Sequence, residues 1–307
     1  MRNSVKKIFF RIADLLLVPF SCIFLPFLKL IRKYGVHYFP LNLKVFLKIG
    51  VFPIRNHYYE PQFIYSKNFD TQKKRNLAIH FNIPGQLNRL QDFQKYSGEL
   101  DQLYTHNPSF GAGDAELYYL MIRNCKPKHI IEIGSGYSTL LALEAIKKNK
   151  ADGFTTALTC IEPYEKDWLE KIVEITLIRK PVEQIPVEFF HSLQENDILF
   201  IDSSHIIRPE NDVLFEYLEL LPALHKGVLI HIHDIFSPRH YRKEWLSELY
   251  RFWNEQYLLE AFLYYNEAFQ IMFSLNYLKN DHFDVLKRTC IHLRPVDEPS
   301  SFWLKKT

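Results

Sequence analysis

The second half of the chain alternates short, uninterrupted apolar runs with longer stretches whose apolar residues recur at helical spacing. Five such runs occupy residues 130–133, 157–161, 175–178, 197–201 and 227–232. Runs without polar alternation are typical of strands covered on both faces in a parallel sheet. Helical patterns fall between and after them, notably at 211–221 and as one long amphipathic helix over 245–262. The pattern therefore predicts a doubly wound α/β fold.

Two more apolar segments come late in the chain and follow a different pattern. Residues 269–275 and 301–304 are strand candidates that follow the five βα units. We therefore expect them to form a hairpin at the edge of the sheet. Before the first strand, Asp114 follows a glycine-rich loop, and it is a natural N-cap for a helix that ends before Pro127.

Polar residues collect where the predicted parallel strands end. The residues concerned are Glu132 and Gly134, Glu162, Asp202 and His205, and His233 and Asp234. In doubly wound sheets, ligands bind beyond the carboxyl ends of the strands. This convergence points to a single functional site at that edge.

The N-terminal segment is apolar and basic. Residues 8–31 are strongly apolar, but charged residues and two prolines interrupt them, which leaves an uncharged core only 14 residues long. A comfortable membrane span needs about 20 residues. Lysine and arginine flanks suit an anionic membrane face. We therefore expect residues 1–35 to make peripheral membrane contact; a buried hairpin kinked at the prolines and a true span remain alternatives.

The modest net charge of +3 hides an asymmetry along the chain. Residues 1–55 hold ten Lys and Arg against one acidic residue, so the remainder carries −6. An acidic body argues against extended nucleic-acid binding, and four scattered cysteines imply a reducing compartment. We predict a membrane-associating extension over 1–55, an irregular aromatic linker and helical cap region over 56–107, and the main domain over 108–307. The expected location is cytoplasmic, at the inner face of the cell membrane.

The segment HIIEIGSGYST, from His129 to Thr139, is a strand, a glycine turn and the start of a helix. Gly134 and Gly136 allow bare backbone to lie against a ligand, and a carboxylate at Glu162 can accept both hydroxyls of a ribose. Both NAD and S-adenosylmethionine offer that diol. Thr139 stands where the dinucleotide fingerprint has glycine or alanine, and Glu132 suits a cationic methionyl group better than a pyrophosphate.

The motifs EIGSGYST, CIEP, LFIDSSH and HIHDIF together resemble class I S-adenosylmethionine-dependent methyltransferases over residues 108–305. The resemblance is closest to the bacterial group of macrolide sugar O-methyltransferases and cephalosporin-hydroxylase-like proteins. It implies a seven-stranded sheet of order 3-2-1-4-5-7-6 with strand seven antiparallel. It also implies cofactor contacts at Glu132, Gly134, Ser135, Gly136 and Glu162, and, through the GDAE segment, at Asp114 and Glu116.

Asp202 and Asp234 follow adjacent strands, whose ends lie about 5 Å apart. They could share a divalent cation that lowers the pKa of a substrate hydroxyl, while His205 takes the proton. The resemblance implies an acidic pair where this chain has His233 and Asp234. The expected ligand set is therefore Asp202, His233 and Asp234, which suits Mn²⁺, Fe²⁺ or Zn²⁺ better than Mg²⁺. A site without metal, with His233 contacting substrate, stays open.

We therefore expect an O-methyltransferase acting on a sugar or glycan-lipid hydroxyl. In it, His205, Asp202 and Asp234 would be catalytic, with S-adenosylmethionine as methyl donor. Two other readings stay open: an NAD-dependent oxidoreductase, and a non-catalytic, membrane-tethered binding protein on the same fold. Thr139 and the absence of a recognisable hydride-transfer pair count against the first. The clustered Asp202, His205 and Asp234 count against the second. The sequence does not define the oligomeric state.

Overall fold

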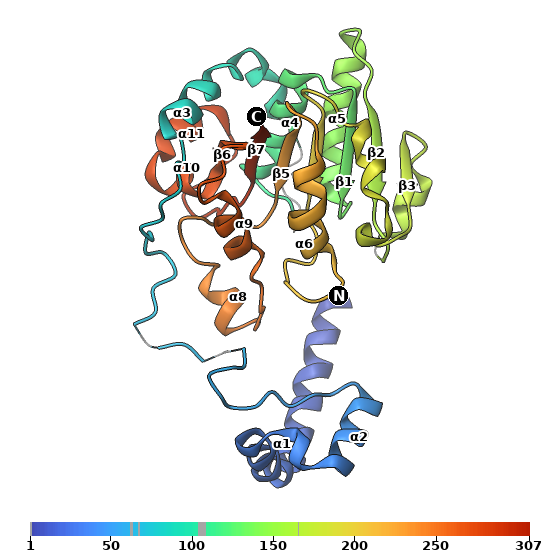
Figure 1. Cartoon of the computed structure of the whole chain (residues 1–307), viewed down its shortest axis with the longest axis vertical. Helices are drawn as coiled ribbons and strands as arrows, with labels where there is room; N and C mark the ends of the chain where they lie inside the picture. The colour runs from blue at the N-terminus through green and yellow to red at the C-terminus, as the bar shows by residue number, and fades with distance from the viewer. Residues whose placement is uncertain (1, 62–63, 67, 104–108, 165) are drawn as a thin grey trace. The chain divides into compact units, whose positions relative to one another are not determined.

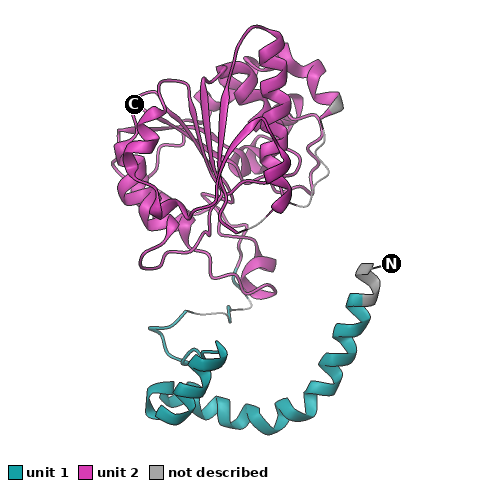
Figure 2. Ribbon diagram, turned by 90° about the vertical axis from the view of Figure 1, so that its right-hand side faces the viewer, with its two compact units in different colours: residues 1–69 teal, residues 70–307 magenta. Residues whose placement is uncertain are grey.

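A computed structural model describes residues 2–61, 64–66, 68–103, 109–164 and 166–307. The chain divides into two compact units, Met1–Phe69 and Asp70–Thr307 (Figure 2). The division falls later than the end of the extension expected at residue 55. Part of the expected cap region, at 62–63, 67 and 104–108, lies outside the described residues.

The first unit contains two helices joined by a short turn. Helix α1 (Arg2–Tyr34) holds Pro19 and Pro26 and is curved in Figure 2, as expected where proline removes a helical hydrogen bond. Its segment Lys6–Tyr34 is long and apolar enough to cross a membrane, a test that signal sequences and soluble core helices also pass. The turn η1 (Val36–Tyr38) leads into α2 (Pro40–Ile49). Pro40 begins helix α2, and Gly50, in the left-handed conformation, ends it.

The second unit is built on a seven-stranded sheet of order β3-β2-β1-β4-β5-β7-β6 (Figure 1). Its strands are β1 (His129–Ile133), β2 (Ala157–Ile161), β3 (Ile175–Ile178), β4 (Ile198–Ile201), β5 (Leu229–Ile232), β6 (Phe269–Ser274) and β7 (Phe302–Lys306). The first five are parallel, and β7 runs antiparallel between β5 and β6. This order confirms the predicted sheet, including its antiparallel strand.

Helical segments cover both faces of the sheet. They are α3 (Ile83–Gln91), η2 (Gln94–Gln102), α4 (Asp114–Cys125), α5 (Tyr137–Ala151), η3 (Asp167–Lys171), η4 (Val182–Gln184), η5 (Val187–Ser192), α6 (Asp212–Phe215), the π-helical η6 (Glu216–Leu220), α7 (Leu221–Ala223), α8 (Lys243–Ser247), α9 (Glu255–Leu263), α10 (Leu275–Asp281) and α11 (Phe283–Thr289). The prediction of one long helix over 245–262 is wrong. The chain breaks between α8 and α9, where Tyr250 takes the left-handed conformation.

Side chains that alternate along each strand form two hydrophobic cores. On one face, Ile130 packs with residues of α4 and α5 such as Leu117 and Ala142. On the other, Ile131 and Ile133 pack with the α6–α7 region and α9. Because β1 to β5 are parallel, their carboxyl ends, with the polar residues that follow them, lie at one edge of the sheet.

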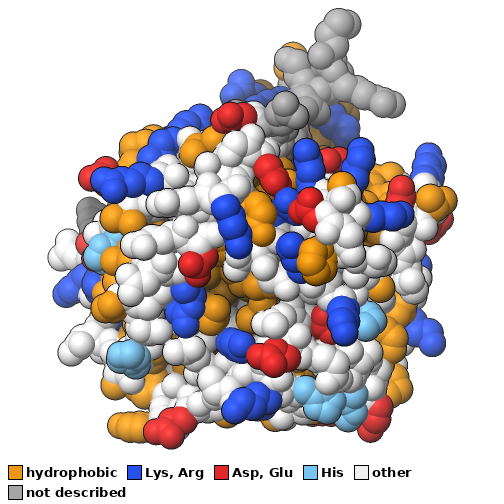
Figure 3. Space-filling view, turned by 90° about the horizontal axis from the view of Figure 1, so that it is seen from above, with side chains coloured by type: hydrophobic (Ala, Val, Ile, Leu, Met, Phe, Trp, Pro, Cys, Tyr) orange, Lys and Arg blue, Asp and Glu red, His pale blue; other side chains and the backbone are white. Residues whose placement is uncertain are grey.

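On the face of the molecule seen in Figure 3, basic and acidic side chains are interspersed.

Candidate active site

The turn after β1 brings bare backbone against the end of β4. Gly134 has a φ of 78°, and a Cβ built on it would lie 1.8 Å from the carbonyl oxygen of Asp202. Its own N–H donates to the carbonyl of Ile161 at 3.0 Å. Only glycine fits where the left-handed conformation and such close packing coincide. The turn is therefore fixed between the ends of β2 and β4.

Glu132 supports the turn from behind. Its fully buried carboxylate accepts hydrogen bonds from the Tyr118 hydroxyl at 3.1 Å and the Thr139 hydroxyl at 2.6 Å, and the Gly136 N–H donates to Thr139 at 3.1 Å. Burial raises the pKa of Glu132 to about 7, even though these hydrogen bonds favour its charged form. Thr139, which departs from the dinucleotide fingerprint, thus links Glu132 to the backbone of the turn.

A cavity of about 450 Å³ lies beside the turn, within the size range of small-ligand sites. Gly134, Ser135 and Gly136 form one wall, and Glu162, whose Oε1 accepts the N–H of Tyr164 at 2.9 Å, forms another. Asp202 and Arg208 also line it. A larger hollow, of about 1110 Å³, lies over α4 and α5, away from the polar strand ends. We place the candidate cofactor site in the smaller cavity because of its chemistry.

Three residues predicted to contact cofactor do not line this cavity: the fully buried Glu132 behind the turn, and two acidic residues of α4. Asp114 accepts the N–H groups of Ser300 at 2.9 Å and Ser301 at 2.7 Å. Glu116 accepts the N–H groups of Gly113 at 3.0 Å and His292 at 2.9 Å. Neither carboxylate lines the cavity beside the glycine turn. Asp114 is also the first residue of α4 rather than its N-cap, which is Gly113. Both carboxylates fasten the start of α4 to the C-terminal segment.

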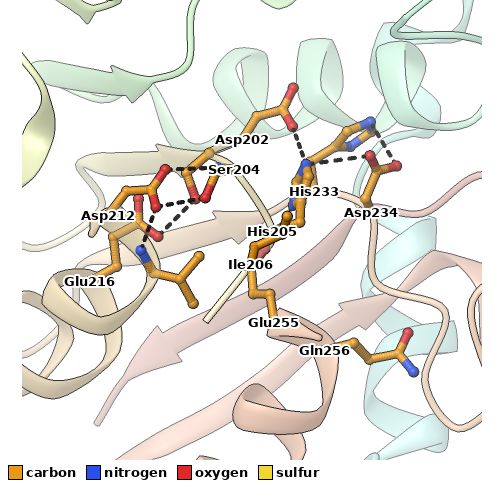
Figure 4. Close-up of polar contacts among 12 residues, drawn as sticks. Asp202, Ser204, His205, Ile206, Asp212, Glu216, His233, Asp234, Glu255 and Gln256 are labelled. Atoms are coloured by element: carbon orange, nitrogen blue, oxygen red, sulfur yellow. Dashed lines mark hydrogen bonds and ion pairs between the residues drawn. The ribbon is translucent and has the colours of Figure 1, made fainter. Parts of the chain in front are cut away.

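The predicted catalytic residues do come together (Figure 4). Nε2 of His205 lies 3.3 Å from Oδ1 of Asp202 and 3.5 Å from Oδ2 of Asp234. On the opposite side of the ring, Nδ1 lies 2.7 Å from Oε2 of Glu255. Oε1 of Glu255 accepts the Tyr217 hydroxyl at 3.0 Å. His205 thus sits in a cage of three carboxylates, of which Asp202 is the most exposed.

The backbone at this cage is unusual. His205 has a φ of 60° and Asp234 a φ of 57°, both in the left-handed region that non-glycine residues seldom adopt. The loop before His205 is tied down because the N–H and hydroxyl of Ser204 both donate to Asp212, at 2.8 Å and 2.7 Å. Strained residues held in this way are concentrated at functional sites.

The charges of the cage control the protonation of His205. Burial alone would lower its pKa, but hydrogen bonds with Asp202 and Glu255 and the charge of Asp234 raise the pKa well above its ordinary value. For Asp202, burial acts to raise the pKa, and the neighbouring His233 and His205 lower it overall. The three carboxylates therefore favour the protonated, positively charged form of the His205 ring.

The potential metal ligands differ from the predicted set. Ligand atoms of Asp202, His205 and Asp234 all lie within 4.8 Å of one another. Within the part of the chain that the structure describes, His233 does not belong to this group. Nε2 of His233 lies 3.6 Å from Oδ1 of Asp234, and its ring packs on Phe110 with centroids 5.1 Å apart. Two carboxylates and an imidazole suit a first-row divalent cation. The cluster therefore contains His205, whereas the predicted ligand set of Asp202, His233 and Asp234 contains His233.

Two residues of the cage were not predicted. Glu255 begins α9, and Trp253 packs on the His205 ring with centroids 4.3 Å apart. Both fall within the single amphipathic helix that the apolar pattern predicts over 245–262. The break between α8 and α9 instead turns them toward the end of β4. Asn254, which accepts the Ile207 N–H at 2.6 Å, marked that break in the sequence as a good N-cap residue.

The strand order defines the class I methyltransferase fold. A family model described as a methyltransferase domain matches residues 131–235, which run from β1 past Asp234. The matched residues 131–235 are thus similar to a methyltransferase domain, in agreement with the resemblance to S-adenosylmethionine-dependent methyltransferases that the motifs carry.

Individual relatives say less about the whole chain. An uncharacterized protein of Archaeoglobus fulgidus is 38% identical over 137 residues, which cover 40% of this chain and 61% of that protein. Among solved structures, the O-methyltransferase TomG of Streptomyces achromogenes with SAM gives a TM-score of 0.37 at 13% identity, covering 72% of this chain and 89% of that one. An O-methyltransferase from Bacillus cereus with SAH gives 0.37 at 12% identity, covering 72% and 90%. Likenesses this distant carry no argument about the substrate.

Proposed function

We propose that the protein is an S-adenosylmethionine-dependent O-methyltransferase. The observation that carries this proposal is the adjacency of the cavity and the cage: Asp202 lines the first and belongs to the second. A cofactor whose ribose diol is bound by Glu162 and whose methionyl group lies against the glycine turn would point its methyl group toward the cage. Transfer then needs an acceptor hydroxyl near Nε2 of His205.

In this proposal His205 is the general base. Glu255 accepts a hydrogen bond from Nδ1–H, so Nε2 is the nitrogen directed at Asp202 and Asp234. His205 can accept the proton of the hydroxyl only in its neutral form. Because the carboxylates raise its pKa, methyl transfer should increase with pH above neutrality.

The donor atoms of the cage fit a divalent cation, Mn²⁺ or Fe²⁺ better than Mg²⁺. Asp202, Asp234 and Nε2 of His205 would hold it. A cation on Nε2 uses the lone pair that His205 needs as a base, so the metal-bound site and the metal-free base are two alternative forms of this proposal. When bound, such a cation supplies a Lewis acid that lowers the pKa of the acceptor hydroxyl. Asp202 and Asp234 would orient that hydroxyl beside His205.

We further propose that the acceptor is a sugar or glycan-lipid hydroxyl, and that residues 1–35 contact the inner face of the cell membrane. The exposed apolar side chains of α1, including Leu15, Leu16 and Ile23, support the membrane contact. A lipid-linked acceptor would then be met at the surface where the enzyme resides, with its catalytic unit in the cytoplasm.

Calorimetric titration of the full chain with S-adenosylmethionine and with NAD tests the donor. Binding of the first with methyl transfer to lipid-linked glycans, lost in His205→Ala, supports the proposal. Binding of NAD without binding of S-adenosylmethionine would contradict the proposed methyltransferase activity and favour an oxidoreductase. Unchanged transfer in His205→Ala would remove His205 as the base while leaving the donor assignment intact.

A further inference from the structure

Helix α2 presents an apolar surface that nothing in the described part of the first unit covers. Leu41, Val45, Leu47 and Ile49 are each more than half exposed, at 76%, 57%, 62% and 62%. The side of the helix that is half-buried carries Leu43 and Phe46. Large apolar side chains therefore lie both on the half-buried side of α2 and on its exposed side. A helix whose outer side faces water in a soluble protein normally carries polar residues there.

The only charges on α2 are two lysines within this exposed surface. Lys44 and Lys48 are one helical turn apart, flanked by Leu41 and Val45 on one side and Leu47 on the other. Lysine can bury its aliphatic stem along apolar surface while its ammonium group reaches a polar layer. Apolar side chains with lysines rising among them suit the boundary between acyl chains and headgroups.

The positive charge of the residues around α2 favours an anionic lipid surface as the partner of this helix. Residues 29–55 hold six Lys and Arg and no Asp or Glu. This segment runs from the end of α1 through η1 and α2. Ile31 and Val36 are buried in it, and Nε of Arg32 donates to the carbonyl of Ile54 at 2.9 Å. The basic residues are thus held close to α2, and their charge complements phosphate groups.

We infer that α2 lies in the headgroup layer of an anionic bilayer, with Lys44 and Lys48 binding lipid phosphates. The inference extends the membrane contact proposed for α1 and is independent of methyl transfer. It assigns α2 a separate role: selecting an anionic lipid surface. A second copy of the chain or a protein partner is not favoured, because either would have to supply acidic groups opposite six positive charges.

The test uses the full chain in vesicles and a probe on α2. Val45→Cys, in a chain with Cys22→Ser, is labelled with an environment-sensitive fluorophore. Quenching by spin-labelled lipid is compared in phosphatidylcholine vesicles with and without phosphatidylglycerol. Leu218→Cys, an exposed apolar position on the second unit, is the matched probe control. We expect quenching at residue 45 that rises with phosphatidylglycerol and falls in 1 M salt, where the Debye length is about 3 Å.

Lys44→Gln with Lys48→Gln should return the residue 45 signal to that of the residue 218 control. Lys147→Gln with Lys150→Gln, which removes the same charge from the exposed side of α5, should leave the signal unchanged. Vesicle flotation checks that each variant still associates through α1. The inference would be overturned if the fluorophore at residue 45 were quenched no more than the one at residue 218 in any vesicle. Equal quenching at residue 45 with and without phosphatidylglycerol would also overturn it.

Discussion

Nδ1 of His205 lies 2.7 Å from Oε2 of Glu255, and Glu255 is completely buried. Because this contact fixes the ring, Glu255 acts as a positioning residue for Nε2. We predict that Glu255→Gln lowers the affinity for Mn²⁺ by about 10- to 100-fold, the usual cost of losing an outer partner of a ligating histidine. Electron paramagnetic resonance of a Mn²⁺ titration measures it.

The control for Glu255→Gln is Glu260→Gln. Glu260 is another buried carboxylate on α9, and it pairs with Arg75 rather than His205. The Glu260→Gln variant should therefore bind Mn²⁺ with the same affinity as the wild type. Equal Mn²⁺ affinity in wild type and Glu255→Gln would show that the contact does not position the ligand.

Gly134→Ala should destabilise the fold and abolish cofactor binding. The new Cβ would collide with the Asp202 carbonyl, and the residue would be held at a φ of 78°. We expect a loss of at least about 2 kcal/mol in the free energy of unfolding, measured by urea denaturation. Gly111→Ala, which meets nothing within 4 Å, should be close to neutral. A stable Gly134→Ala would mean that the turn and the end of β4 are not in contact.

Glu162→Ala should weaken S-adenosylmethionine binding by about 10- to 100-fold, since it removes a charged acceptor for the ribose hydroxyls. Isothermal titration calorimetry measures the change. Glu188→Ala, at a position outside the cavity, serves as the control. Full affinity in Glu162→Ala would locate the ribose elsewhere.

The protonation of Glu132 should appear in the pH dependence of stability. Burial raises its pKa from 4.5 to about 7 in the folded state, so the folded chain holds this proton more tightly than the unfolded chain. The resulting stability is fully present below about pH 4.5 and is lost as pH rises through 7, up to about 3 kcal/mol.

Glu132→Gln removes the titration and keeps an acceptor for Tyr118 or Thr139. We predict that its stability relative to wild type increases between pH 5 and pH 8, measured by thermal unfolding. Glu144→Gln, on the exposed side of α5, should show no such trend. A constant difference between Glu132→Gln and wild type across this range would contradict the raised pKa.

Periodicity was sufficient to predict the five parallel strands, because buried β-branched runs are a local signal. The order of the seven strands, with β7 antiparallel, came from the resemblance to class I methyltransferases. The meeting of Asp202, His205 and Asp234 also followed from strand ends alone. Which histidine lies beside both carboxylates did not follow, because the position of the His205 ring depends on left-handed backbone at His205 and Asp234. Glu255 was missed because a broken helix and a continuous one share nearly the same apolar pattern. For Asp114 and Glu116, hydrogen bonds to a segment more than 170 residues away decide their role, and no local pattern carries that information.

The position of β7 has a consequence for when the site can form. This strand is made after β5 and β6 yet lies between them. Ser300, just before it, donates its hydroxyl to Asp234 at 3.0 Å and its N–H to Asp114 at 2.9 Å. During synthesis, the ribosome therefore delivers every residue of the cage before it delivers the segment that secures them. The nascent chain should acquire its ordered site only once β7 has inserted.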